Sequence, residues 1–294
     1  TTLFDMPNTK PATTAVALLE EKRKLAAAKC LVNYGFHFGA TADNIAEIKK
    51  ANNIASVKVY MGSSTGNLLV TEEKALQDIF GSGKLIAVHA ESEETIRINT
   101  DIFRNADIKD AAEFHLMIRS NEAAEKELAR AIAIAKRNKS RLHLCHMSTK
   151  EEAGMVAAAK NEHNLLSCEV TPNHLFLTVE SAKELGNYAK VNPPLRTKED
   201  VVALWKAIGE GIVDMVATDH APHLREEKEQ DYWNAPSGMP GLQTMLPLLL
   251  DAVNKGRLSL QQLVKLTAGN PAALFGIKGK GKIAVGMDAD IAIV

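Results

Sequence analysis

V-A-T-D-H-A-P-H, residues 216–223, places an acid, two histidines and a proline directly after an apolar run, 212–217, that predicts a short buried strand. Pro222 prevents the strand from continuing, so Asp219 and His223 are expected in a rigid turn at its carboxyl end. In barrels of alternating strands and helices, active sites lie at this end. Taken alone, the stretch fits equally well an Asp that caps the next helix, with surface histidines beside it.

Strands and helices alternate along the whole chain. This order predicts a parallel sheet with right-handed crossovers, that is, an α/β fold of the (β/α)8 TIM-barrel type. We predict seven strands, whereas a closed barrel has eight, so one strand is expected to be missing. The predicted strands cover 1–6, 31–38, 56–61, 84–91, 141–147, 165–172 and 212–219. We expect the barrel to span 1–276, and 281–294 to form a turn and hairpin of different character.

Composition narrows the class of protein. The 294 residues are 46% hydrophobic and 24% charged, which favours one large soluble domain. A net charge of -1 with interspersed signs argues against a nucleic-acid or acidic-membrane surface. The 3 cysteines are far apart and form no C-x-x-C, which favours a reducing compartment. Without a signal peptide or a long apolar run, a cytoplasmic protein is expected.

Lys58 stands in the centre of the apolar strand predicted over 56–61. Burying a lysine is costly unless its charge is paired or its amine is chemically changed. Two explanations remain open. Lys58 forms an ion pair, which the residues alone favour, or its amine takes up carbon dioxide and becomes a carbamate that bridges two metal ions.

Histidines lie near the ends of two further strands. His89 is close to the carboxyl end of 84–91. His143 and His146 differ by three positions, so strand alternation places them on opposite faces. We expect His146 to be the ligand and His143 to be structural. Lys58, His89, His146 and Asp219 would then lie together at the barrel's carboxyl end, where they suit a divalent metal ion.

Several motifs resemble the cyclic amidases of the amidohydrolase superfamily, especially its dihydroorotase branch. They occur in family order and span nearly the whole chain. The matching stretches are D-M-P-N-T-K-P at 5–11, V-K-V-Y-M at 57–61, V-H-A-E at 88–91, C-H-M-S-T at 145–149, V-T-P-N-H-L at 170–175, V-N-P-P-L-R at 191–196, A-T-D-H-A-P-H at 217–223 and G-M-D-A-D at 286–290.

The resemblance implies a zinc site with one or two ions per chain. Lys58 would be the carboxylated bridging lysine, and His89 and His146 would bind one zinc. Asp219 would bind the other zinc and act as the catalytic acid and base. The implied substrate-binding positions are Asn8, Asn192, His223, Ser237 and Gly238.

The implied activity is that of a dihydroorotase, which interconverts N-carbamoyl-L-aspartate and L-dihydroorotate in pyrimidine biosynthesis. N-P-P-L-R at 192–196 favours this substrate over those of allantoinase or hydantoinase/dihydropyrimidinase. The expected partners are a small cyclic amide and a second copy of the chain, because an unpaired sheet edge at a missing strand invites association.

Two departures from the family pattern bear on activity. The family's first strand carries an H-x-H metal pair followed in dihydroorotases by an arginine, and no such stretch occurs in these residues. The chain also ends where the family continues into a small β-sandwich, so we expect 277–294 to be its start. A catalytically inactive scaffold or a truncated fragment is therefore the rival hypothesis. Asn173 stands where the family often has a histidine, and little consequence is expected.

Overall fold

A computed structural model describes residues 1–62, 68–105 and 114–294. Its strands form one six-stranded parallel sheet in the order β3-β4-β5-β6-β7-β8 and one parallel pair, β1-β2. The strands are β1 (Thr2–Asp5), β2 (Asn33–Phe36), β3 (Phe38–Gly39), β4 (Val57–Tyr60), β5 (Leu85–His89), β6 (Arg141–Leu144), β7 (Leu166–Val170) and β8 (Met215–Val216). A strand lies at each of the seven predicted places. The second is divided at His37, where the chain stops pairing with β1 and begins to pair with β4.

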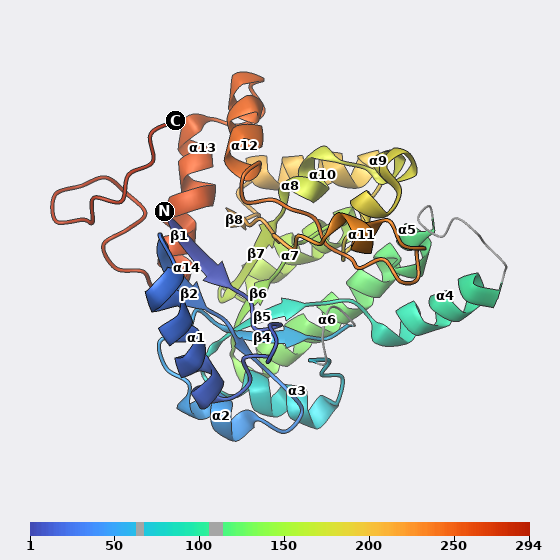
Figure 1. The fold of residues 1–294 in the computed structure, drawn as a ribbon, viewed down its shortest axis with the longest axis horizontal. Helices are drawn as coiled ribbons and strands as arrows, with labels where there is room; N and C mark the ends of the chain where they lie inside the picture. The colour runs from blue at the N-terminus through green and yellow to red at the C-terminus, as the bar shows by residue number, and fades with distance from the viewer. Residues whose placement is uncertain (63–67, 106–113) are drawn as a thin grey trace.

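Helices connect the strands and cover the outside of the sheet (Figure 1). The longer ones are α1 (Val16–Lys29), α2 (Ile45–Lys50), α3 (Glu73–Phe80), α4 (Glu93–Asn105), α6 (Asn121–Asn138), α7 (Lys150–Glu162), α9 (Val179–Leu185), α10 (Lys198–Gly209) and α12 (Met245–Asn254). The shorter ones are α5 (His115–Ile118), α8 (Pro172–Phe176), η1 (Gly186–Ala189), α11 (Arg225–Lys228), α13 (Leu260–Val264), η2 (Lys265–Gly269) and α14 (Asn270–Leu274). None of the described helices is both long and apolar enough to cross a membrane.

The alternation of side chains explains why polar residues occur in buried strands. Lys58, Ala87, His143 and Ser167 are register partners in four neighbouring strands, so their side chains share one face, the inner face. The residues between them, such as Val57 and the leucines of β6, belong to the main hydrophobic core. Burying each such aliphatic side chain contributes about 1.5–3 kcal/mol. The outer face therefore packs on the helices and leaves the inner face free for polar chemistry.

Phe275, the residue after α14, shows that the sheet curls. Its ring centroid lies 4.7 Å from that of Phe4 in β1, 5.8 Å from that of His37 and 6.2 Å from that of His143 in β6. Strands at distant positions in the sheet order therefore approach the same ring. This is the curvature expected of a barrel whose strands surround a packed interior.

The structure corrects three predicted elements. The strand expected over 212–219 is only Met215–Val216, because the side chain of Asp214 accepts the Cys168 backbone N–H and replaces a ladder bond. Thr13 or Thr14 is expected to cap a helix that runs to about Lys29, but helix α1 begins after Ala15. Residues 277–294 form no strand, so the hairpin expected there is absent. Ile283 and Ile293 are 87% and 96% exposed, since no neighbouring sheet covers them.

Candidate metal centre

Three of the four candidate metal ligands lie at or just after the carboxyl ends of parallel strands, and the fourth, Lys58, lies within its strand. Lys58 is inside β4 and His89 is the last residue of β5. His146 follows β6 by two residues and Asp219 follows β8 by three. Both have left-handed backbones, with φ 38° and 45°. Such a φ is uncommon for residues other than glycine and marks sharp turns at functional sites.

His89 and His146 are directed at each other from neighbouring strand ends. His89 Nδ1 lies 3.1 Å from His146 Nε2, and the ring centroids are 4.8 Å apart. Both side chains are buried. Burial lowers the pKa of both histidines, and at His146 the neighbouring charges of His89 and Lys58 lower it further. Both rings are therefore neutral at physiological pH, which is the form that binds metal.

Glu91 holds the ring of His89 in one tautomer. Its Oε2 lies 2.8 Å from His89 Nε2 and accepts hydrogen bonds from Arg119 Nε and Nη2 at 3.0 and 2.5 Å. Burial alone would raise the pKa of Glu91, but Arg119 and the hydrogen bond from His89 hold it well below its usual value. The carboxylate therefore keeps a proton on His89 Nε2 and leaves the Nδ1 lone pair facing His146. Carboxylate–histidine pairs of this kind orient metal ligands.

Lys58 is buried beside the residue that precedes His146. Its Nζ donates to Cys145 Sγ at 3.0 Å, and it has no ion pair among the described residues. Burial lowers the pKa of Lys58, whereas the charges of Cys145 and Tyr60 raise it, and the net direction is upward. The upward effects require a thiolate and a phenolate, yet burial raises the pKa of Cys145 and of Tyr60 to about 12. At neutral pH those two groups are uncharged, so the carboxylates of Glu169 and Asp219 are the charges that oppose the effect of burial on the amine.

Asp219 is half-buried, and its carboxyl group titrates near neutrality. Burial raises its pKa to about 6, with Lys58 opposing the rise and Glu169 adding to it. A positive charge normally favours the ionised carboxylate, so the proximity of Lys58 keeps the pKa from rising further.

The residues present fit a zinc ion at the histidine pair. Zinc–nitrogen bonds of about 2.0–2.1 Å at a tetrahedral angle separate two ligand nitrogens by roughly 3.3 Å. The distance between His89 Nδ1 and His146 Nε2 is 3.1 Å. His146 Nδ1 is buried and has no hydrogen-bond partner among the residues that the structure describes.

The prediction that only one of His143 and His146 faces the interior is wrong. Strand β6 ends at Leu144, so alternation does not extend to His146, which a turn brings inward. His143 lies on the inner face, where its Nε2 is 3.0 Å from Glu169 Oε2 and its Nδ1 is 2.9 Å from Ser167 Oγ. His143, Cys145 and Glu169 form a buried group with spacing that could hold a metal ion. Both ring nitrogens of His143 are already hydrogen-bonded to these neighbours.

Four of the predicted substrate-binding positions lie on two loops that are hydrogen-bonded to each other. The Gly238 N–H donates to Lys190 O at 2.9 Å, two residues before Asn192. His223 Nε2 lies 3.2 Å from Ser237 O. Gly238 has φ 148°, and a Cβ there would lie 2.4 Å from Ala221 O, so only glycine fits.

Asn8 is at the same end of the sheet, three residues after β1, and is exposed. It belongs to the loop whose Pro7 accepts the Thr13 N–H. The stretch G-S-S-T-G-N at 62–67 predicts a polar loop, and the charge pattern predicts a long helical region over 111–137. Residues 63–67 of the loop and 111–113 of the helical region lie outside the described residues.

Sequence reasoning missed four buried polar residues around this site, namely Glu91, Arg119, His115 and Lys228. Lys228 Nζ donates to the carbonyl oxygens of Lys190, Pro236 and Gly238 at 2.9–3.2 Å. A signal existed for Glu91, because it ends the V-H-A-E motif two residues after His89. Nothing in the sequence pattern indicated the other three.

Comparison with known proteins agrees with this geometry. The amidohydrolase family model matches residues 1–294. A dihydroorotase from Methanosarcina acetivorans is 39% identical over 306 residues, which cover 100% of this chain and 65% of that protein. An L-hydantoinase from Paenarthrobacter aurescens is 34% identical and is covered to 67%. The chain thus spans about two thirds of the length of these curated relatives.

Solved structures are similar over nearly the whole chain. L-hydantoinase (dihydropyrimidinase) from Arthrobacter aurescens superposes with a TM-score of 0.94 at 33% identity, covering 98% of this chain and 66% of that one. A dihydropyrimidinase from Brevibacillus agri has a TM-score of 0.90 at 28% identity and the same coverages. The predicted α/β fold of the TIM-barrel type is confirmed. The chain belongs to the amidohydrolase family.

Proposed function

We propose that the protein is a zinc-dependent hydrolase of cyclic amides and that its substrate is dihydroorotate. The observation that carries the proposal is the pair of neutral, buried histidines whose nitrogens converge at 3.1 Å, with Asp219 at the same end of the strands and Lys58 within the neighbouring strand β4. Dihydroorotases are among the relatives with 37–39% identity over the whole chain, which favours that substrate.

In this proposal His89 and His146 would hold one zinc ion, and Lys58, as a carbamate, together with Asp219 would supply ligands for a second. Bound zinc supplies a water of lowered pKa and polarises the amide carbonyl. Asp219 takes the proton of the attacking water and delivers it to the leaving ring nitrogen. Glu91 keeps His89 in the metal-binding tautomer, and the buried inner face excludes bulk water around these groups.

Substrate recognition is assigned to the loops around the metal centre. Asn8, Asn192 and His223 offer side-chain donors to the substrate's carboxylate and carbonyl oxygens, while Ser237 offers its backbone and Gly238 provides the turn that places it. The two loops that carry Asn192 and Gly238 are joined by the Gly238 N–H···O Lys190 hydrogen bond, so their separation is fixed before substrate binds.

A hydantoinase is the second candidate function. The L-hydantoinase from Paenarthrobacter aurescens at 34% identity and the L-hydantoinase structure with a TM-score of 0.94 favour it. The two functions differ in the substrate, because dihydroorotate carries a carboxylate on its ring and hydantoin does not. Allantoinase is a further alternative within the same reaction class.

Hydrolysis assays on the zinc-loaded protein test the proposal. We expect opening of dihydroorotate to exceed that of hydantoin, dihydrouracil and allantoin at equal concentration. Growth with ¹³C-bicarbonate should give a carbamate carbon signal that is absent from a Lys58→Arg variant. Zinc binding without turnover of any of the four compounds would favour the inactive scaffold.

Cellular place and assembly also belong to the proposal. We propose a cytoplasmic enzyme that acts as a dimer on a small molecule, without nucleic-acid or membrane partners. Light scattering distinguishes the mass of a monomer from that of a dimer. A monomer at micromolar concentration would contradict the proposed dimer.

A further inference from the structure

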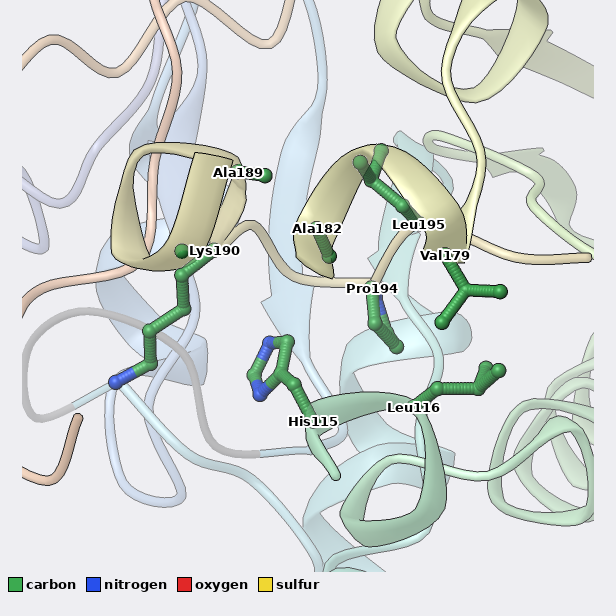
Figure 2. Close-up of a pocket in the computed structure, with 9 residues that line it drawn as sticks. His115, Leu116, Val179, Ala182, Ala189, Lys190, Pro194 and Leu195 are labelled. Carbon is green, nitrogen blue, oxygen red and sulfur yellow. The ribbon is translucent and has the colours of Figure 1, made fainter. Parts of the chain in front are cut away.

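His115 in α5 is buried between the two loops assigned to substrate binding. Its Nε2 lies 2.9 Å from Val191 O and 2.9 Å from Asn192 Oδ1, and its Nδ1 lies 2.5 Å from the Tyr232 hydroxyl. Figure 2 shows its ring directed toward the segment between Lys190 and Pro194. Both ring nitrogens of His115 are therefore hydrogen-bonded to residues of these two loops.

These contacts determine which nitrogen of His115 carries the proton. Val191 O is a backbone carbonyl and can only accept, so the proton must be on Nε2. Burial lowers the pKa of His115 to about 3, which keeps the ring neutral at physiological pH. A neutral imidazole has one N–H, so Nδ1 accepts from the Tyr232 hydroxyl.

The tautomer of His115 in turn determines the orientation of the Asn192 side-chain amide. Since Nε2 donates, the atom of Asn192 that faces it must be the acceptor Oδ1, which settles the otherwise ambiguous orientation of an amide. Asn192 is half-buried, and its Nδ2 makes no hydrogen bond to another residue in the described part of the chain. Two N–H donors therefore remain for a ligand.

We propose that His115 is a positioning residue that selects substrates bearing a hydrogen-bond acceptor, because it turns the Asn192 amide so that its N–H groups face the bound ring. The inference rests on the proposed function, since it assumes that a cyclic amide binds beside Asn192. Tyr232 belongs to the same unit. Its hydroxyl saturates Nδ1, so the ring is held in the Nε2–H form from both sides.

The loop that carries Tyr232 is itself anchored to the Asn192 segment. Lys190 Nζ donates to the backbone oxygens of Tyr232 and Ala235 at 2.6 Å and lies 4.2 Å from the Tyr232 ring centroid. Tyr232 is thus joined to the segment that carries Asn192 both through Lys190 and through His115.

A pair of substitutions tests this role. His115→Leu removes the Nε2–H donor, so the Asn192 amide is free to rotate and present an acceptor to the substrate. His115→Gln places an amide N–H near the lost donor and should restore the orientation. We expect KM for dihydroorotate to rise about tenfold in His115→Leu with kcat within about twofold, and His115→Gln to recover most of the loss.

His163→Leu is the matched control, because His163 is a buried histidine whose Nε2 lies 2.9 Å from a backbone oxygen, that of Ser140, far from these loops in sequence. It should lower stability and leave KM unchanged. An equal rise of KM in this control, or no difference between the leucine and glutamine variants at position 115, would overturn the positioning role.

A measurement without turnover separates this inference from the proposed function. Side-chain ¹⁵N spectra of the full protein should show His115 as a neutral imidazole with its proton on Nε2 at pH 7. In Tyr232→Phe the signal of the protonated Nε2 should remain but become broader. An Nδ1–H tautomer or an imidazolium would refute the inference. If the wild type opens no cyclic amide, the proposed function fails. The positioning role of His115 is then still tested by the ¹⁵N spectra and by calorimetric binding of dihydroorotate to the wild type and to His115→Leu.

Discussion

Glu91→Gln should weaken zinc binding without touching a metal ligand. The glutamine keeps the size of the side chain but loses the charge that holds the proton on His89 Nε2. Replacing such carboxylate partners typically costs about 10–100-fold in metal affinity, or roughly 1.4–2.8 kcal/mol. Glu91 is 0% exposed, so water cannot take the place of the lost interaction.

The same change leaves Arg119 without its carboxylate. Arg119 is 6% exposed and donates twice to Glu91. Removing one partner of a buried ion pair costs about 3–5 kcal/mol, so we expect a fall of about 3 kcal/mol in the free energy of unfolding, because the amide oxygen still accepts one bond.

Zinc competition against a chromophoric chelator measures the first effect, and urea unfolding of the metal-free protein measures the second. Glu94→Gln is the control, since Glu94 pairs with Lys126 at 2.8 Å on the exposed surface. Glu94→Gln should change neither the zinc affinity nor the free energy of unfolding measurably. A zinc affinity of folded Glu91→Gln within twofold of the wild type would refute the argument that this carboxylate prepares His89.

Three further expectations concern the substrate loops. Burial lowers the pKa of His115 to about 3 from 6.5, so between these values the unfolded chain binds a proton that the native chain does not, and stability falls as pH falls. His115→Gln should flatten this decline in pH-dependent unfolding of the metal-free protein, and equal slopes would contradict the assignment. Gly238→Ala should raise KM at least tenfold because its Cβ would meet Ala221 O at 2.4 Å, whereas Gly154→Ala, with open space around it, should stabilise α7 slightly. Lys228→Met removes three hydrogen bonds to carbonyls and should make the loop after Lys228 more sensitive to limited proteolysis, with an unchanged cleavage rate as the contrary result.

The parallel architecture was predictable because the inner and outer faces differ in polarity along each strand. In V-K-V-Y and in L-S-C-E-V, alternate residues pack on helices while the others face inward, so period-two patterns and intervening helices identify the strands. Strand β8 was predicted too long because its ends are set by a tertiary contact, the Asp214 side chain bonded to the Cys168 N–H. A run of apolar residues carries no information about such a contact.

The candidate metal ligands were predictable for a related reason. Parallel strands bring their carboxyl ends to one edge, so residues that end several strands must meet there. The predicted face of His143 was wrong, because alternation was extended beyond Leu144, where the strand has ended. Arg119, His115 and Lys228 were not predictable, since each is polar at a buried position and acts through partners distant in sequence.

The most direct test of the metal centre is zinc content and dihydroorotate hydrolysis on the same samples of wild type and His146→Asn. Because His146 Nε2 faces His89 Nδ1, the variant loses half of the histidine pair. The account predicts bound zinc in the wild type and loss of both zinc and hydrolysis in the variant, while circular dichroism remains native. Equal zinc content in the two proteins, or hydrolysis that survives in folded His146→Asn, would contradict it.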